Sequence, residues 1–280
     1  MLSCRKTDDF VTKKRNKMKK IVALVAVLFS VVVPVQSQAA DSKALVIIDS
    51  YFDSRVTGAE VVCRQSLDCS VTSLPVSTSL SSPINHGVAM VEVAKRQSDS
   101  IKIIALRSAT TTKKSANELN AGDFIEALTW VNNNSSIVSA VSVSRYFNGT
   151  KPCSPSSTGT APYGGVASAD AKIKSLISSL KLKGIPVFAS TGNTFGKAVD
   201  YPACILDTNA VSTGEYNKSN QIVSANSFDA NTDFFATSTV YNYSSSIFGL
   251  LPQTTSSATA AVAAQYVAGN QLSKIVQVTR

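Results

Sequence analysis

Strand-length apolar runs alternate with segments of helical periodicity along most of the chain, and this alternation limits the fold more than any other feature. In the helical segments, apolar residues recur every three or four positions. Because strands that alternate with helices form parallel sheets covered on both faces, the pattern predicts a three-layer α/β domain with a mostly parallel central sheet. The strand-like runs cover 44–49, 101–106, 137–143 and 185–189, and the helical segments cover 86–97, 116–132 and 167–182.

The first 40 residues have the features of an export signal. Positive charges at Met18-Lys19-Lys20 precede an apolar run over 21–35, and Ser37-Gln38-Ala39 supplies the small residues that a signal peptidase reads. This run is shorter than a bilayer crossing requires. We expect a signal peptide over 1–40, Sec-type export to the periplasm or outside the cell, and one folded domain over 41–280. The residues before Met18 are either an extended n-region or, as we favour, a stretch that precedes the true start at Met18. No membrane association is expected after cleavage.

Most of the positive charge belongs to this leader. The whole chain has a formal net charge of +9, from 27 Lys and Arg against 18 Asp and Glu. Residues 1–40 hold eight of the basic and two of the acidic residues, a net +6, which leaves 9 − 6 = +3 for residues 41–280. A basic chain can indicate nucleic-acid binding. Since the excess lies in the targeting segment, no nucleic-acid partner is expected.

Four of the five cysteines follow the leader, which contains Cys4. An even number of cysteines in an exported chain indicates disulfides, and four cysteines allow three pairings. We favour Cys63–Cys69, which closes a small loop, and Cys153–Cys204, which joins two distant loops. A zinc site built from the four thiolates is the alternative. The wide spacing between Cys63 and Cys69 and the oxidising export route both disfavour it.

Polar residues follow two of the predicted strands. Asp49 ends the run at 44–49, and the sequence STGN at 190–193 follows the run at 185–189. The carboxyl ends of parallel strands meet at one edge of a sheet, where ligands bind. The chain contains a single histidine, His86, at the start of a helical segment. If the protein is a histidine-dependent enzyme, His86 is its base.

Four short blocks resemble those of the subtilases, the subtilisin-like serine peptidases. Their order of Asp, His, Asn and Ser is the subtilase order. Each block alone is a weak signal, whereas four blocks in this order over 44–268 are a strong one. The blocks are VIIDS at 46–50, similar to V-A-V-I-D-[ST]-G; HGVA at 86–89, similar to H-G-T-H; ASTGN at 189–193, similar to A-A-G-N; and TTSSATA at 254–260, similar to G-T-S-M-A-T-P.

The resemblance implies a subtilisin-like fold and an exported serine endopeptidase that acts on peptides or proteins as a monomer. Ser256 would be the nucleophile, His86 the general base, Asp49 the carboxylate that orients it, and Asn193 the oxyanion donor. The stretch 258–268 is expected to be a helix opened by Ser256, with its free N–H groups near the reacting carbonyl. No cofactor or metal is expected, although calcium bound by backbone carbonyls is compatible with the sequence.

Each of these residues also has a purely structural interpretation. Asp49 could close a strand, Asn193 could be a turn residue after glycine, and Ser256 could be a helix N-cap. Thr255 and Ser257 stay open as alternative nucleophiles. The joint arrangement favours the catalytic interpretation.

The chain departs from the subtilase pattern where a substrate would bind. The family carries N-M-S-L-G-G, whose glycines let a substrate backbone pair as an added strand. Residues 142–147 read SVSRYF here, so the implied substrate-binding residues are Ser144, Arg145, Tyr146 and Phe147. We expect the two aromatic rings to crowd the primary pocket. Thr254 and Ala260 replace the usual glycine and proline, and no propeptide is expected.

Two alternatives follow from these departures. One is a pseudopeptidase of the same fold, which binds a peptide or protein partner with little or no turnover. The other is a periplasmic small-ligand-binding domain, in which the four blocks would be unrelated in space.

Overall fold

The computed structural model describes thirteen stretches of the chain, and every structural statement below concerns these residues. The chain divides into two units, Met1–Ala40 and Asp41–Arg280. All described residues belong to the second unit, so the expected signal peptide lies outside them. The stretches are 43–49, 52, 55–63, 83–108, 120–144, 153–155, 164–193, 199–205, 210–216, 234–237, 244–245, 249–250 and 254–269.

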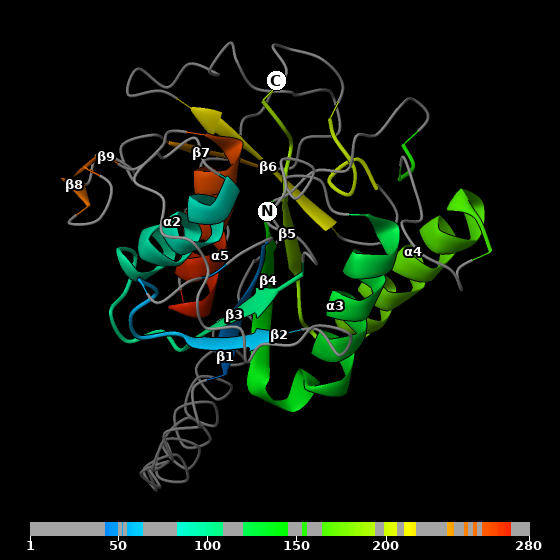
Figure 1. Ribbon diagram of the computed structural model, residues 1–280, viewed down its shortest axis with the longest axis horizontal. Coiled ribbons are helices and arrows are strands. Elements are labelled where there is room, and N and C mark those ends of the chain that lie inside the picture. Colours follow the sequence, from blue (N-terminus) through cyan, green and yellow to red (C-terminus); the bar gives the residue numbers. More distant parts are fainter. Residues whose placement is uncertain are drawn as a thin grey trace, which may run out of the picture. The chain divides into compact units, whose positions relative to one another are not determined.

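Seven strands form one sheet in the order β2-β3-β1-β4-β5-β6-β7, and every neighbouring pair is parallel (Figure 1). A short antiparallel pair, β8 and β9, is separate from it. The mostly parallel sheet expected from the sequence is therefore confirmed. The bounds are β1 Ala44–Asp49, β2 Glu60–Cys63, β3 Ile103–Arg107, β4 Val138–Val143, β5 Val187–Ser190, β6 Ala210–Tyr216, β7 Phe234–Thr237, β8 Ser244–Ser245 and β9 Gly249–Leu250.

Helices cover both faces of this sheet. Figure 1 shows α2 and α5 on one side and α3 and α4 on the other, and two hydrophobic cores correspond to these two interfaces. The arrangement is the three-layer α/β architecture that the alternating pattern predicts. The bounds are α2 Pro83–Lys95, α3 Ala121–Asn133, α4 Val166–Leu182 and α5 Thr255–Val267, with a short 3₁₀ helix at Ser135–Ile137.

Strand β1 lies inside the sheet, between β3 and β4, and is buried at all six positions. Its side chains alternate between the two cores. Leu45 and Ile47 pack on the α2/α5 side, and Val46 and Ile48 pack on the α3/α4 side. Because both faces are covered, the strand is apolar at consecutive positions until Asp49, whose parity places its carboxylate on the α2/α5 side.

Helix α5 runs through the α2/α5 core. The first ten residues of the helix, Thr255 to Ala264, are all buried, and each is Thr, Ser, Ala or Val. Small side chains let the helix pack closely against the sheet and against α2, and the helix carries no ionisable group except Tyr266 near its end. Beyond the buried turns, Gln265 Nε2 donates to Gln97 Oε1 at 2.9 Å and joins the C-terminal ends of α5 and α2.

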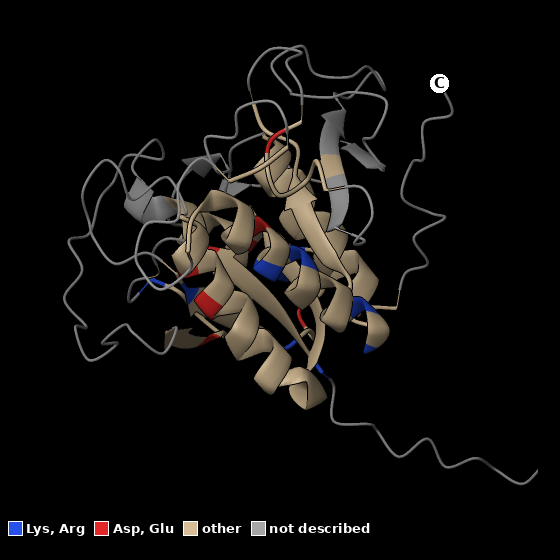
Figure 2. Ribbon diagram, turned by 90° about the vertical axis from the view of Figure 1, so that its right-hand side faces the viewer, with Lys and Arg blue, Asp and Glu red and all other residues tan. Residues whose placement is uncertain are grey.

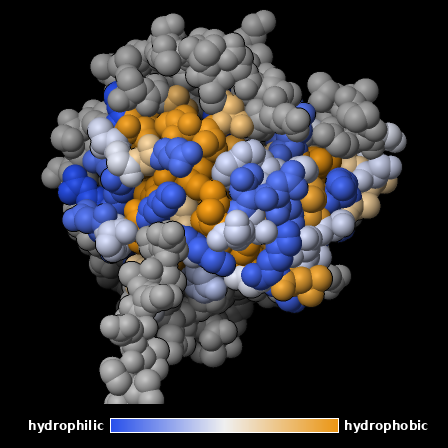
Figure 3. Space-filling view, turned by 90° about the horizontal axis from the view of Figure 1, so that it is seen from below, coloured by the Kyte–Doolittle hydropathy of each residue, from blue (hydrophilic) through white to orange (hydrophobic). Residues whose placement is uncertain are grey.

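Figure 2 shows Lys, Arg, Asp and Glu scattered over helices and element ends. On the face seen from below, hydrophobic side chains show between hydrophilic ones (Figure 3). The exposed large apolar residues are Val61, Ile137, Val166 and Leu182, and Leu182 at the end of α4 is 88% exposed. Among the described helices, none has the length and apolar character that a bilayer crossing requires.

Helix boundaries differ from the sequence expectation by a few residues, and the residues at the two helix starts explain two of the differences. Helix α2 begins at Pro83, a residue that suits the first turn because it needs no N–H acceptor. Helix α3 begins at Ala121 and not at 116, because Asn120 caps it. The Asn120 Oδ1 accepts from the Asp123 N–H at 2.8 Å, and the Asn120 Nδ2 donates to Asp123 Oδ2 at 2.7 Å.

Candidate active site

Asp49 and His86 form a direct pair at the carboxyl edge of the sheet. The His86 Nδ1 lies 2.6 Å from the Asp49 Oδ2. Asp49 ends β1 and is fully buried, whereas the His86 side chain, in the first turns of α2, is 24% exposed. A carboxylate can only accept, so Nδ1 carries the proton when the imidazole is neutral, and Nε2 is left as the acceptor.

The backbone of Asp49 is held by the strand beside it. Both the backbone N–H and the hydroxyl of Ser108 donate to the Asp49 carbonyl oxygen, each at 2.8 Å. Ser108 directly follows β3 and is fully buried. This double contact fixes the end of β1 relative to the end of β3, and with it the root of the Asp49 side chain.

Ser144 and Ser256 lie against each other one strand further along the sheet. Ser144 directly follows β4, which neighbours β1, and Ser256 is in the first turn of α5. The Ser144 hydroxyl donates to the Ser256 carbonyl oxygen at 3.1 Å, and the Ser256 hydroxyl donates to the Ser144 carbonyl oxygen at 3.1 Å. The start of α5 is therefore fastened to the end of β4.

Asn193 contacts the same turn of α5 from the other side. It follows β5, is exposed, and accepts at Oδ1 from both the backbone N–H of Thr255 at 3.2 Å and its hydroxyl at 3.1 Å. With Oδ1 occupied twice, the side-chain NH₂ is left to donate elsewhere. The turn interpretation of Asn193 therefore does not describe what its side chain does.

The first turn of α5 separates the three candidate nucleophiles. Thr254 is the N-cap and its hydroxyl accepts from the Ser257 N–H at 3.3 Å, so Ser256 is not the cap. Thr255 and Ser257 are fully buried, whereas Ser256 is 6% exposed. Ser256 is thus the most exposed residue of the three, and its N–H lies in the turn where a helix offers no internal acceptor.

The four predicted catalytic residues therefore lie at one edge of the sheet, at the ends of the neighbouring strands β1, β4 and β5. Asp49 holds His86, while Ser256 and Asn193 meet the same turn of α5. In the described residues no hydrogen bond joins His86 to Ser256, because the Ser256 hydroxyl donates to the Ser144 carbonyl oxygen. Arg145, Tyr146 and Phe147 lie outside the described residues.

The grouping also bears on one alternative. A small-ligand-binding domain would leave the four blocks unrelated in space, whereas here residues far apart in the sequence contact one another at one edge. The sequence analysis did not single out two residues at this edge, Arg107 and Ser108, and it considered Thr255 only as a nucleophile and not as the partner of Asn193. An arginine ending an otherwise apolar run was a signal for the first, since a charge in that position has to face something polar.

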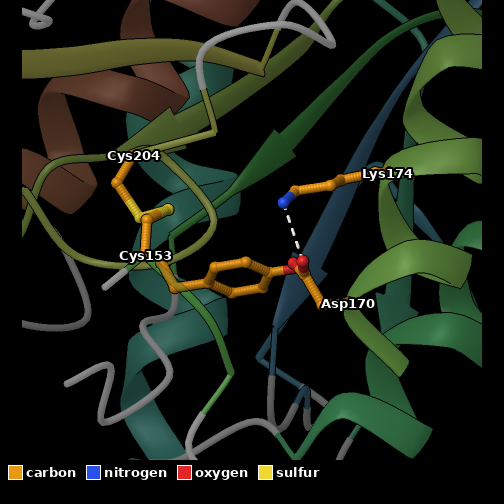
Figure 4. The surroundings of a disulfide bond; sticks show 5 residues. Cys153, Asp170, Lys174 and Cys204 are labelled. Carbon is orange, nitrogen blue, oxygen red and sulfur yellow. Dashed lines mark hydrogen bonds and ion pairs between the residues drawn. A yellow bond between two sulfur atoms is a disulfide. The ribbon is translucent and has the colours of Figure 1, made fainter. Parts of the chain in front are cut away.

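A disulfide joins Cys153 and Cys204, as favoured from the sequence, and excludes a zinc site of four thiolates (Figure 4). In the sequence Cys153 comes after β4 and Cys204 comes after β5. The disulfide therefore joins the segment that continues from Ser144 to the segment that continues from Asn193. Cys63 also takes part in a disulfide. Cys69, its favoured partner, lies outside the described residues.

Two ionisable groups lie close to this disulfide in sequence. Tyr201 is fully buried, and its hydroxyl donates to Asp170 Oδ1 at 3.0 Å, while Lys174 pairs with Asp170 at 2.7 Å (Figure 4). Burial, and then the Asp170 carboxylate, raise the pKa of Tyr201 well above its usual value. Burial raises the pKa of Asp200 to about 6. The Asp200 N–H donates to the Thr191 carbonyl, two residues before Asn193.

Metal binding has no candidate site in the ranges described. No three His, Cys, Asp or Glu side chains converge there. Calcium bound through backbone carbonyls stays a prediction from the sequence.

Solved structures share this fold at low sequence identity. The prenylagaramide maturation protease PagA is 16% identical with a TM-score of 0.54, covering 82% of this chain and 79% of that one. A lanthipeptide protease is 15% identical with a TM-score of 0.54, covering 80% and 72%. The epidermin leader peptide processing serine protease EpiP of Staphylococcus aureus is 13% identical with a TM-score of 0.53, covering 81% and 64%. No family profile and no curated protein matches the sequence.

These similarities and the strand order define the fold as the three-layer α/β fold of subtilisin-like serine proteases. At such identities the likeness establishes the fold and not the activity.

Proposed function

We propose that the protein is an exported serine endopeptidase with Asp49, His86 and Ser256 as its triad and Asn193 as an oxyanion donor. The observation that carries the proposal is the 2.6 Å contact between His86 Nδ1 and the buried Asp49 carboxylate. The only histidine of the chain is thereby held in the tautomer in which Nε2 can take a proton.

The reaction is acyl transfer from the peptide to water. The Ser256 Oγ attacks the scissile carbonyl carbon while its proton passes to His86 Nε2, and the carbonyl oxygen becomes an oxyanion. The tetrahedral intermediate collapses as His86 gives this proton to the leaving amine, which leaves an acyl ester on Ser256. Water, deprotonated by His86, then cleaves the ester, and the proton returns to Ser256.

Two donors are available for the oxyanion. One is the NH₂ of Asn193, whose orientation is set by the two hydrogen bonds that Thr255 gives to Oδ1. The other is the Ser256 N–H in the first turn of α5, where the partial positive charge of the helix dipole also favours a negative oxygen. Losing one such donor typically costs about 3–4 kcal/mol of transition-state stabilisation.

The Ser256 hydroxyl has to leave Ser144 before it can react. In the structure it donates to the Ser144 carbonyl oxygen. A turn about the Ser256 Cα–Cβ bond would release this contact and aim the hydroxyl toward another acceptor. Catalytic hydrogen bonds often form only in the substrate complex, so the resting orientation is compatible with catalysis.

The substrate would lie along the end of β4, next to Ser144 and through Arg145, Tyr146 and Phe147. In the sequence, Tyr146 and Phe147 take the positions at which the family has glycines that leave space for a substrate backbone. PagA is named as a prenylagaramide maturation protease and EpiP as a leader peptide processing protease. These names suggest precursor peptides as the first substrates to test. Hydrolysis of a long, unstructured protein such as casein should be weak.

A fluorophosphonate probe tests the triad. It needs only a reactive serine, its base and the oxyanion donors, so it should label the parent at Ser256 and should not label Ser256→Ala. Ser257→Ala, which removes a buried hydroxyl one residue away, is the matched control and should retain labelling. No labelling of a folded parent would contradict the peptidase.

A pseudopeptidase is the second candidate, and one observation favours it. The Ser256 hydroxyl is bonded to Ser144 and not to His86. If that orientation persists with a substrate bound, the chain would bind peptides without cutting them. Replacing both rings, as Tyr146→Gly/Phe147→Gly, separates the two candidates: a crowded peptidase should gain casein hydrolysis mainly through tighter substrate binding, whereas a pseudopeptidase should gain binding alone.

A further inference from the structure

Arg107 lies beside the Asp49–His86 pair, in a position that the proposed reaction does not use. It is the last residue of β3 and only 8% exposed. The strand register places it directly opposite Asp49 on one side and Cys63 on the other. Figure 1 shows β3 next to β1 beneath α2, the helix that carries His86.

The side chain of Arg107 starts on the same face of the sheet as those of Asp49 and His86. Residues opposite each other in parallel strands point to the same face. Ile103 and Ala105, which share the parity of Arg107, pack in the α2/α5 core with Leu45 and Ile47, which share the parity of Asp49. Neighbouring strands are about 4.8 Å apart, so the arginine side chain begins one strand spacing from the carboxylate.

The backbone makes this relation rigid. Ser108, the next residue, donates twice to the Asp49 carbonyl oxygen. Arg107 and Asp49 therefore cannot slide past each other without breaking two buried hydrogen bonds.

Among the described residues, few other charged side chains lie on the elements packed around the pair. Helix α5 and strand β4 have no acidic or basic residue. On β2, Glu60 lies at the opposite end of the strand. Helix α2 carries Glu92 and Lys95, and Arg96 directly follows it; the nearest of these is six residues from His86, or about 9 Å along the axis. Arg55, in the segment before β2, lines a separate cavity with these three residues.

We propose that Arg107 is a positioning residue that keeps the Asp49–His86 pair free of an extra proton at rest. A guanidinium stays charged at every pH at which proteins fold. A positive charge that starts on this face, one strand spacing from Asp49, favours the ionised carboxylate and repels a proton that would convert the imidazole to imidazolium. The base would then be available at lower pH than without Arg107. This role rests on the proposed function only for its kinetic consequence.

The test uses the fact that the chain has one histidine. The imidazole C–H resonances of protein prepared without a histidine tag report His86 alone, and they can be followed by NMR from pH 4 to 9 whether or not the protein is active. Arg107→Gln should show tighter proton binding by about three- to tenfold, a midpoint higher by about half a unit to one unit. Arg107→Lys keeps the charge and should resemble the parent.

Arg96→Gln is the matched control because it removes one positive charge from the exposed side of α2, where Arg96 pairs with Glu92. Its midpoint should shift far less. A shift in Arg107→Gln no larger than this, or an equal shift in Arg107→Lys, would overturn the proposal. Arg107→Met gives a second neutral variant. If neither neutral variant folds while Arg107→Lys does, Arg107 serves stability and the proposal is also wrong.

The kinetic consequence is measured by the rate of fluorophosphonate labelling of Ser256 against pH. In Arg107→Gln the acid limb should move to higher pH by the same interval, with little loss of rate at pH 9, whereas a purely structural defect would slow labelling at every pH. If the parent is not labelled at all, the proposed peptidase function fails, and the NMR comparison still decides the role of Arg107.

Discussion

Ser144 and Ser256 exchange hydrogen bonds in both directions, each hydroxyl donating to the carbonyl oxygen of the other residue at 3.1 Å. The pair joins residues that are 112 positions apart in the sequence and fastens the start of α5 to the end of β4. Two neutral hydrogen bonds of this kind are worth about 1 kcal/mol each in folding. Their position makes them matter more for where Ser256 lies than for how stable the domain is.

Replacing Ser144 by alanine should loosen that attachment. We expect Ser144→Ala to lower the free energy of unfolding by about 1 kcal/mol and to reduce the labelling rate of Ser256 several-fold. Ser142→Ala, two residues earlier on β4, is the control, because the Ser142 hydroxyl is buried without a hydrogen-bond partner. That variant should be as stable as the parent or slightly more stable. Denaturant titration measures the stability and probe kinetics measure the labelling rate. Equal stability and equal labelling rates in the two variants would contradict this role of the Ser144–Ser256 hydrogen bonds.

The amide of Asn193 can be tested by an isosteric change. Asn193→Asp keeps two oxygens that can accept from Thr255 but loses the NH₂ donor, and it adds a negative charge where an oxyanion should form. Labelling and peptide hydrolysis should fall by at least about 100-fold, with stability nearly unchanged because Asn193 is exposed. Asn193→Ala should lose a similar factor. A variant that keeps most of its activity would exclude Asn193 as an oxyanion donor.

Asp200 should make stability depend on pH. Burial raises its pKa to about 6 in the folded state, above the ordinary value of 3.8. The folded state therefore binds the Asp200 proton more tightly than the unfolded state, so stability falls as the pH rises from about 4 to 6 and is then constant. Because the carboxyl is partly exposed, we expect a loss of about 1–2 kcal/mol, smaller than the full shift implies.

Asp200→Asn should remove this loss and be more stable than the parent at pH 7. The difference between parent and variant across pH 4 to 7 isolates Asp200 from other titrating groups, and Asp99→Asn, which removes an exposed carboxylate, should leave the curve unchanged. Parallel stability curves for parent and Asp200→Asn would contradict the prediction.

The Cys153–Cys204 disulfide closes a long loop, with a sequence separation of 51. Removing it as Cys153→Ala/Cys204→Ala should lower the free energy of unfolding by about 2–4 kcal/mol, largely because the unfolded chain gains freedom. Tyr201→Phe, a nearby change that removes the hydroxyl donating to Asp170, should cost about 1 kcal/mol. Thermal unfolding of both variants measures the difference, and a double-alanine variant as stable as the parent would contradict it.

The sequence predicts the parts of this protein that depend on local pattern. The strand over 44–49 is found with the expected bounds, because a continuous apolar run that ends in Asp49 is compatible with an inner, doubly covered strand. The pairing of Cys153 with Cys204 was also predictable. The Asp49–His86 contact agrees with the place that the resemblance assigns to those residues, although their chemical roles still await the probe.

The parts that could not be predicted depend on contacts between distant segments. Nothing near Asn193 in the sequence indicates that Thr255 would hold its Oδ1, and nothing near Ser144 indicates a bond to Ser256. The apolar run expected as a strand ends at Leu106, one residue before Arg107. In the sheet Arg107 belongs to β3 and faces Asp49, a relation that only the register between strands creates.

The burial of α5 determines how this protein should lose function when it is heated. Ser256 lies in the first turn of a helix whose first ten residues are all buried and which contacts five strands. Such a segment opens only when the whole domain does, so its amides should be among the slowest to exchange with deuterium. Inactivation and global melting would then occur at one temperature, and a preparation that survives heating with its fold intact would also keep its reactive serine.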